Sequence, residues 1–190
     1  MDNIDGQTSP FCAGFCDPGF YCPTFATVEP IPCPNGTFCP AGSASPLLCP
    51  SGRYCDRTSV SSASDCLTCP PGSVCPAGSV APLPCPSGSV QAQAGSSLCN
   101  FCAPGYFQNV TGSVGCQKCP SGKYADVRGS AECNSCLAGQ YSNQSGSTRC
   151  DACPAGTYTE EPSQASCVPC GPGGEPLLTL RALRCHEQHY

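Results

Sequence analysis

The residues of this chain that could do chemistry are its cysteines. Cysteine accounts for 22 of the 190 residues, about 12%, which exceeds the roughly 8–10% that marks a disulfide scaffold. Thiols at close spacing can bind zinc, exchange electrons or cross-link the chain. The positions of the cysteines and of the few histidines decide among these possibilities.

Zinc binding is the first possibility to consider, because residues 99–119 contain the pattern C-x2-C-x13-C-x2-C of a zinc ribbon. Zinc would leave Cys85, Cys185 and most first-half cysteines without a role, whereas disulfides use an even number of them completely. A redox-active C-x2-C needs a strand–helix–strand context, which the sequence does not provide. We therefore predict disulfides throughout, no free thiol, no metal ion and no cofactor apart from covalent sugars.

Catalysis by histidine is confined to the last residues of the chain. His186 and His189 are the two histidines present, and their spacing of three differs from the four of a zincin helix. The repeats before them hold no histidine, which excludes a Ser-His-Asp or Cys-His site there. We predict that the protein is not an enzyme.

The cysteines belong to a repeat. Ten C-x-x-G units carry glycine three positions after the first cysteine (position +3), and position +5 is aromatic in seven of them. Most units begin roughly 17 residues after the previous one, which is typical of an array of small modules. The units begin at Cys16, Cys33, Cys49, Cys69, Cys85, Cys102, Cys119, Cys136, Cys153 and Cys170.

The second cysteine of each unit divides the array into regions. It follows the first at position +6 (C-x5-C) in the first half and precedes it at position −3 (C-x2-C) in the second. We predict an N-terminal segment at 1–11, C-x5-C repeats at 12–84, C-x2-C repeats with a 17-residue period at 85–170, and a divergent tail at 171–190.

Second-half spacing points to equal loops, because a cysteine stands at position +14 of each unit from Cys85 to Cys153. Such loops, with one final loop of 15, use every cysteine from 85 onward. The predicted bridges are Cys85–Cys99, Cys102–Cys116, Cys119–Cys133, Cys136–Cys150, Cys153–Cys167 and Cys170–Cys185.

First-half spacing leaves two pairings open. We favour a set in which the second cysteine bonds forward, with short loops at the two ends. In an alternative set, forward pairing continues through a Cys75–Cys85 bridge. That set leaves Cys69 and Cys99 without partners. The favoured set is Cys22–Cys33, Cys39–Cys49, Cys55–Cys66, Cys12–Cys16 and Cys69–Cys75.

Each loop has the pattern of a small hairpin. After Cys119 come a Pro-Ser-Gly turn, a short strand over 123–126 and a return turn at Gly129-Ser130. Leu, Ile, Val and Phe make up only about 15% of the chain, too little for a large core. The fold class predicted is therefore small disulfide-rich repeats, an elongated array of short β-hairpin and loop units with little regular secondary structure. The aromatic at +5 should pack on the bridges.

Charge and hydropathy restrict the partners. The net charge is −5 and the lysines form no cluster, so nucleic acid is not expected. No apolar run reaches the roughly 20 residues that span a bilayer. Residues 1–5 lack the features of a secretory leader, yet disulfides need an oxidising compartment. We expect the chain to be a mature piece or a fragment of a longer secreted protein.

Three N-glycosylation sequons fit an exported protein: Asn35-Gly-Thr, Asn109-Val-Thr and Asn143-Gln-Ser. Asn109 and Asn143 occupy the same repeat position, +7. We predict sugar at these asparagines.

Residues 116–124 (CQKCPSGKY), 39–43 (CPAGS) and 49–55 (CPSGRYC) carry a resemblance to a known family. With their copies over residues 12–170, they resemble the ephrin-receptor-like cysteine-rich repeats, tandem modules of secreted and surface proteins that are abundant in protists. The resemblance implies an extracellular location, or one on the cell or ciliary surface. It also implies a non-enzymatic role, often within long filaments such as algal mastigonemes.

Two functions of different classes follow. A regular array favours a structural extracellular glycoprotein, a disulfide-stapled rod in a surface, ciliary or extracellular filament, which self-associates into a homo-oligomer or filament. The alternative is a receptor-type ectodomain or stalk that binds a protein ligand. Binding residues concentrate on irregular loops, so the nearly constant loop lengths favour the structural role.

Overall fold

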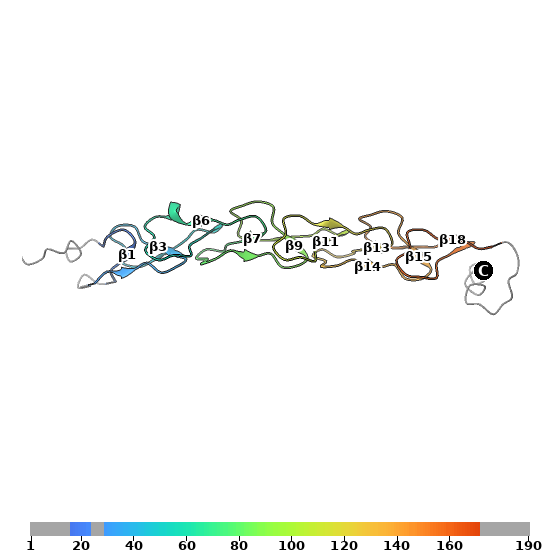
Figure 1. The fold of residues 1–190 in the computed structure, drawn as a ribbon, viewed down its shortest axis with the longest axis horizontal. Helices are drawn as coiled ribbons and strands as arrows, with labels where there is room; N and C mark the ends of the chain where they lie inside the picture. Colours follow the sequence, from blue (N-terminus) through green and yellow to red (C-terminus); the bar gives the residue numbers. More distant parts are fainter. Residues whose placement is uncertain (1–15, 24–28, 172–190) are drawn as a thin grey trace, which may run out of the picture. The chain divides into compact units, whose positions relative to one another are not determined.

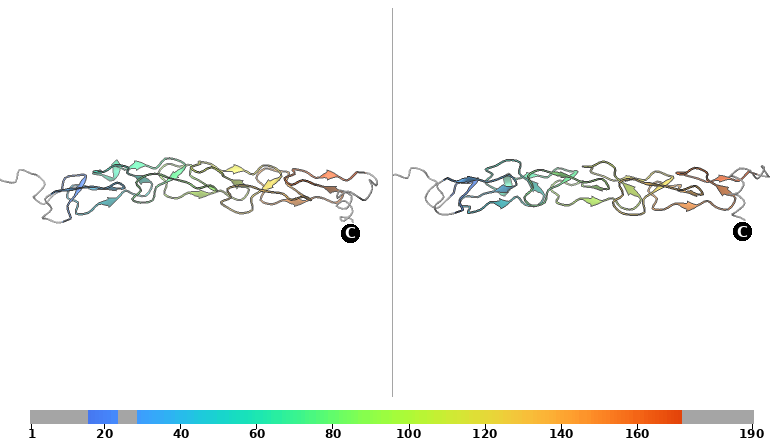
Figure 2. Two further views of the ribbon diagram at one scale, coloured as in Figure 1. Left: turned by 60° about the horizontal axis from the view of Figure 1, so that its bottom comes forward. Right: turned by 90° about the horizontal axis from the view of Figure 1, so that it is seen from below.

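The computed structural model describes residues 16–23 and 29–171. Regular structure in these segments consists of two-residue strands in antiparallel pairs and one short 3-10 turn (Figure 1). Each pair is a separate two-stranded sheet, and Figure 2 shows the short strands from two further directions. The predicted array of small hairpins with almost no helix is confirmed.

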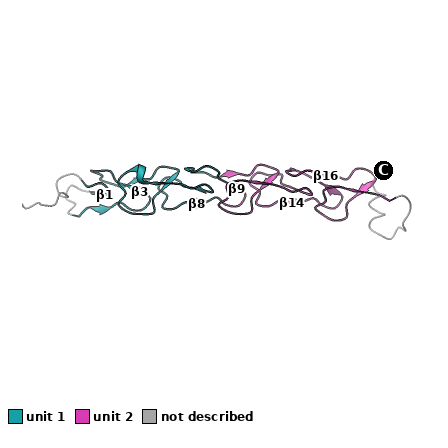
Figure 3. Cartoon of the chain, turned by 45° about the horizontal axis from the view of Figure 1, so that its top comes forward, with its two compact units in different colours: residues 1–85, 91–99 teal, residues 86–90, 100–190 magenta. Residues whose placement is uncertain are grey.

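The chain divides into two compact units, Met1–Cys85 with Gln91–Cys99, and Pro86–Val90 with Asn100–Tyr190 (Figure 3). Unit 1 pairs β1 (Phe20–Tyr21) with β2 (Ile31–Pro32), β3 (Thr37–Phe38) with β4 (Leu47–Leu48), β5 (Arg53–Tyr54) with β6 (Leu67–Thr68), and β7 (Ser73–Val74) with β8 (Leu83–Pro84); it also holds η1 (Ala63–Asp65). Unit 2 pairs β9 (Ser89–Val90) with β10 (Asn100–Phe101), β11 (Tyr106–Phe107) with β12 (Gln117–Lys118), β13 (Lys123–Tyr124) with β14 (Asn134–Ser135), β15 (Gln140–Tyr141) with β16 (Asp151–Ala152), and β17 (Thr157–Tyr158) with β18 (Val168–Pro169).

The hairpin after Cys119 shows why the sequence folds in this way. Lys123 N–H donates to the Pro120 carbonyl at 3.1 Å and closes the turn, and Gly122 takes a φ of 80° that glycine adopts without strain. In the strand pair that follows, Tyr124 lies opposite Asn134. The strand ends at Tyr124, before the predicted end at 126. Its partner strand lies between Cys133 and Cys136, beyond the predicted loop, which ends at Cys133.

Sulfur forms most of the interior. Of the 15 buried hydrophobic residues in the described segments, 13 are cysteines, and the other two are Val60 and Ala125. The aromatic residues at +5 are half-buried. Phe38 packs on a cluster that contains the cysteines of the next repeat, which agrees with the predicted packing of aromatics on bridges. Cross-links and their immediate neighbours therefore take the place of an apolar core.

The second-half disulfides close equal loops. Five bridges have a sequence separation of 14 and Cα–Cα distances of 5.6–5.7 Å, and they are the pairs that the spacing predicts. Cys170 also forms a disulfide, whereas its predicted partner Cys185 lies outside the described residues. The five are Cys85–Cys99, Cys102–Cys116, Cys119–Cys133, Cys136–Cys150 and Cys153–Cys167.

The first-half pairing that we favoured was wrong except at Cys69–Cys75. The second cysteine bonds back to its own unit cysteine instead of forward, because the turn at +3 reverses the chain. That reversal brings the two Cα atoms to 5.9–6.0 Å, within bridging range. The predicted Cys12–Cys16, Cys22–Cys33, Cys39–Cys49 and Cys55–Cys66 are replaced by Cys16–Cys22, Cys33–Cys39 and Cys49–Cys66; Cys12 itself lies outside the described residues.

One thiol overturns the prediction that every cysteine is paired. Cys55 is free and buried, because its unit cysteine, Cys49, bonds Cys66 across a separation of 17. This repeat thus uses a long loop of the second-half kind although it also carries the C-x5-C spacing.

Candidate functional site

A hydrogen-bond ladder between backbones joins each repeat to the next. The N–H of the +3 glycine donates to the carbonyl at +6 of the following repeat, at 2.7–3.1 Å for the described repeats from Gly19 to Gly139. The bonds in unit 1 are Gly19–Cys39, Gly36–Cys55, Gly52–Cys75 and Gly72–Gln91. Those in unit 2 are Gly88–Gln108, Gly105–Ala125, Gly122–Ser142 and Gly139–Thr159. The ladder bonds join backbone atoms and depend mainly on register, although at Gly139 the N–H also donates to the Thr159 hydroxyl at 2.8 Å.

A second set of bonds runs from return turns to the preceding repeat. In unit 2, Gly129 N–H donates to the Cys102 carbonyl at 2.8 Å and Gly146 N–H donates to the Cys119 carbonyl at 2.7 Å. In the last described loop the donor is Ser163, which keeps a φ of 63° although it is not glycine. The unit cysteines are therefore fixed by their backbones as well as by their bridges.

Position +6 is the one that sequence reasoning missed. It carries the second cysteine in the first half; in the second half it carries buried polar residues and, in one repeat, the buried Ala125. Gln108 Nε2 donates to the Gly115 carbonyl at 2.8 Å, while its Oε1 accepts from Val110 N–H at 3.0 Å. Gln91 makes the same two contacts one repeat earlier, with Leu98 and Gln93. Glutamine recurs at +6 in these two consecutive repeats, and that recurrence was the available signal.

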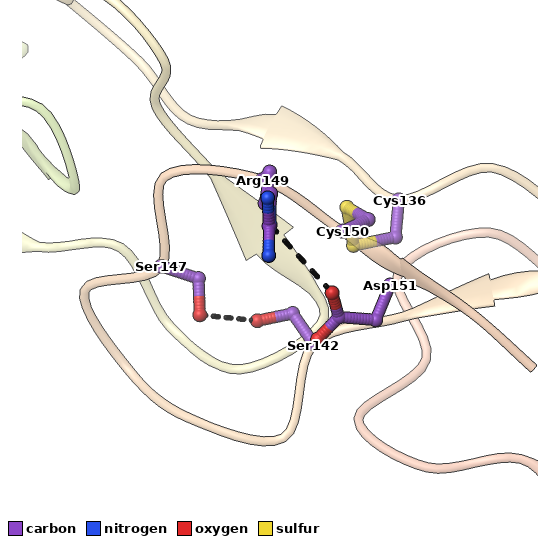
Figure 4. A network of polar contacts seen from close by, with 6 residues as sticks. All are labelled: Cys136, Ser142, Ser147, Arg149, Cys150 and Asp151. Carbon is purple, nitrogen blue, oxygen red and sulfur yellow. Dashed lines mark hydrogen bonds and ion pairs between the residues drawn. A yellow bond between two sulfur atoms is a disulfide. The ribbon is translucent and has the colours of Figure 1, made fainter.

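Around the Cys136–Cys150 bridge the +6 residue is Ser142 (Figure 4). Its hydroxyl donates to Ser147 Oγ at 2.6 Å inside the loop that the bridge closes. Arg149 and Asp151 form an ion pair at 3.7 Å, with side chains 85% and 61% exposed. An exposed pair of this kind contributes about 0–1 kcal/mol, so the bridge and the buried hydroxyl dominate this repeat.

The sequon asparagines at +7 lie on the surface. Asn109 and Asn143 are exposed and directly follow the buried +6 residues Gln108 and Ser142. Asn35 is also exposed, but its side-chain amide donates to the Asp56 carbonyl at 3.3 Å. The alternation of a buried and an exposed residue presents both +7 asparagines from equivalent places in their repeats.

The cysteines with zinc-ribbon spacing all lie in disulfides. Among the described residues, no three Cys, His, Asp or Glu side chains are grouped to hold a metal ion. His186 and His189 lie outside the described residues. No helix in the segments that the structure describes could cross a bilayer.

Comparison with known proteins identifies the repeat type. Residues 90–136, 122–163 and 139–176 match the family described as tyrosine-protein kinase ephrin type A/B receptor-like. These segments overlap and together span residues 90–176, which include most of the C-x2-C repeats. Modules of this type are typical of extracellular, non-catalytic regions and fit protein interaction. No curated protein matches the chain.

Proposed function

We propose, given that residues 90–176 are ephrin-receptor-like cysteine-rich repeats, that the chain is a structural extracellular glycoprotein. It would act as a disulfide-stapled rod within a surface, ciliary or extracellular filament. The observation that supports this role is the backbone ladder from the +3 glycine to the next +6 carbonyl, which recurs through both units.

The ladder suits a spacer because it tolerates sequence change. Exposed residues can vary without disturbing a bond between an N–H and a carbonyl, provided that the glycine and the bridge remain. In repeat arrays each module is stabilised mainly by its neighbours, so length is set by the number of modules. A spacer needs a fixed length and a durable backbone, and both follow from these features.

Self-association is the second element of the proposal. A repeat presents the same exposed positions at a fixed interval, so a contact between two copies can recur along them and propagate. The acidic balance, net −5, disfavours nucleic acid as the partner. The partner in a filament would be further copies of this chain.

A receptor-type stalk that binds a protein ligand is the second candidate, and one observation favours it. The second strands of three consecutive unit 1 hairpins expose leucine, with Leu48 at 60%, Leu67 at 42% and Leu83 at 54% exposure. Exposed apolar side chains in neighbouring hairpins can contribute to a protein contact.

Electron microscopy of the native material, labelled with an antibody against residues 85–170, separates the two. A structural rod predicts label that recurs along filaments. Label at isolated sites on the membrane, one chain to each, would contradict the filament role and favour the stalk.

A further inference from the structure

Cys55 is a buried nucleophile beside an existing bridge. Its residue is 1% exposed, and it lies in one cluster with Cys49, Val60 and Cys66. Cys49 and Cys66 are bonded to each other, and the Cys55 thiol donates to the Arg57 carbonyl at 3.1 Å. The sulfur atoms of Cys49, Cys55 and Cys66 therefore lie in one buried cluster, where only two of the three can form a disulfide at any one time.

The backbone holds Cys49 and Cys55 as it holds a bonded pair. In the next repeat Cys69 and Cys75 are bridged, with Cα atoms 5.9 Å apart. In both repeats the +6 cysteine accepts from the preceding +3 glycine and donates to the following return turn. The bonds are Gly36–Cys55 and Cys55–Ser79 in one repeat, and Gly52–Cys75 and Cys75–Ser96 in the other. The matching bonds hold Cys55 as Cys75 is held, which is a position from which a bridge to the unit cysteine can form.

We propose that Cys49, Cys55 and Cys66 form a thiol–disulfide exchange centre. The Cys55 thiol loses its proton to water, and its thiolate attacks Sγ of Cys49. The Cys49–Cys55 bond forms as the Cys49–Cys66 bond breaks, and Cys66 leaves as a thiolate that takes up a proton. One disulfide and one thiol stand on each side of the reaction, so no external oxidant or reductant is required.

The exchange changes how residues 56–66 are held. In the bridge observed, Cys66 ties this loop and η1 to the unit cysteine. After exchange, the backbone bonds of the loop and the contact of Arg53 with the Cys66 carbonyl at 2.7 Å remain to hold it. When the loop is unfolded, a separation of 6 closes about fivefold more readily than one of 17. Loosening the loop should therefore drive the exchange forward.

The full chain, produced in an oxidising host, allows a direct test by thiol mapping. After incubation at mildly alkaline pH, with and without sub-denaturing urea, it is quenched in acid, unfolded with N-ethylmaleimide and mapped without reduction. We expect the label on Cys55 and Cys66, with the share on Cys66 rising in urea. A label confined to Cys55, a label on Cys49, or no label on any of the three would overturn the proposal.

Two variants retain one bridge at Cys49 and so protect the test against misfolding. Cys55→Ser keeps Cys49–Cys66, and labelling at Cys66 should be lost. Cys66→Ala should show a Cys49–Cys55 bridge on mapping. Labelling at Cys66 that persists in the first variant, or free thiols at both remaining cysteines in the second, would contradict exchange through Cys55.

Discussion

Gly122 packs against the carbonyl oxygen of Ser163, a residue two repeats further along the chain. A Cβ placed on Gly122 would collide with that oxygen, and the φ of 80° at Gly122 already disfavours any other residue. The same approach joins Gly88 to Gly129 and Gly105 to Gly146. The invariant +3 glycine therefore serves both its own turn and the stacking of repeats.

Substitution of Gly122 by alanine tests this role. We expect Gly122→Ala to lower the free energy of unfolding by at least about 2 kcal/mol, since the backbone strain adds to the collision. Urea unfolding with the bridges intact, followed by tyrosine fluorescence, measures the change. Gly156→Ala is the matched control, because Gly156 has a φ of 78° but no described atom within 4 Å of its Cβ position. Equal losses in the two variants would show that stacking adds nothing.

Ser163 gives a prediction of the opposite sign. It takes a φ of 63° at a return-turn position where several other repeats have glycine. Ser163→Gly should raise the free energy of unfolding by about 0.5–1 kcal/mol, because glycine adopts this conformation without steric cost. Ser166→Gly, at an exposed position in the same loop, is the control and should not stabilise. A loss of stability in Ser163→Gly would contradict the strain assigned to this residue.

Gln108 should be required for the stability of its loop. Its side chain is 4% exposed and satisfies one backbone donor and one backbone acceptor. Gln108→Ala is expected to cost about 1–3 kcal/mol and to accelerate hydrogen exchange at the Val110 amide. Gln117→Ala, on the exposed strand β12, should stay within about 0.5 kcal/mol of the parent. An unchanged rate of hydrogen exchange at the Val110 amide would contradict a role of the Gln108 side chain in holding the loop.

Much of the second half was predictable because one rule governs it. A constant separation of 14 restricts the pairing, and the C-x-x-G turn fixes where each hairpin begins. The strands were predicted too long, because Ala125 at +6 leaves the hairpin and its carbonyl accepts the Gly105 N–H instead. Contacts between repeats depend on how modules stack, and no local pattern contains that information.

The disulfide pairing of the first half was predicted wrongly because the cysteine spacing there is compatible with more than one pairing. The favoured prediction paired Cys39 forward with Cys49. The chain instead reverses at Gly36, and Cys39 meets Cys33. At Cys49 both kinds of loop are available, and spacing alone cannot show that Cys66 is the partner chosen. The glutamines at +6 were missed because cysteine occupies the same position throughout the first half.

Sugar is predicted at Asn109 and Asn143, which are exposed at equivalent places. Glycopeptide mass spectrometry of protein from its natural source should find both modified. Asn109→Gln and Asn143→Gln should each remove one glycan without altering the disulfide map. Two bare asparagines in the natural material would refute the glycoprotein assignment.

Local bridges and bonds between nearby repeats are expected to build an extended array. Small-angle scattering of the isolated chain with its bridges intact tests this most directly. A compact domain of this length would have a radius of gyration of about 16 Å. No bridge between two described residues spans more than 17 positions, and ten modules that each advance a few extended residues reach on the order of 100 Å. We expect a radius of gyration of about 30 Å; a value below about 20 Å would contradict the rod and the structural function built on it.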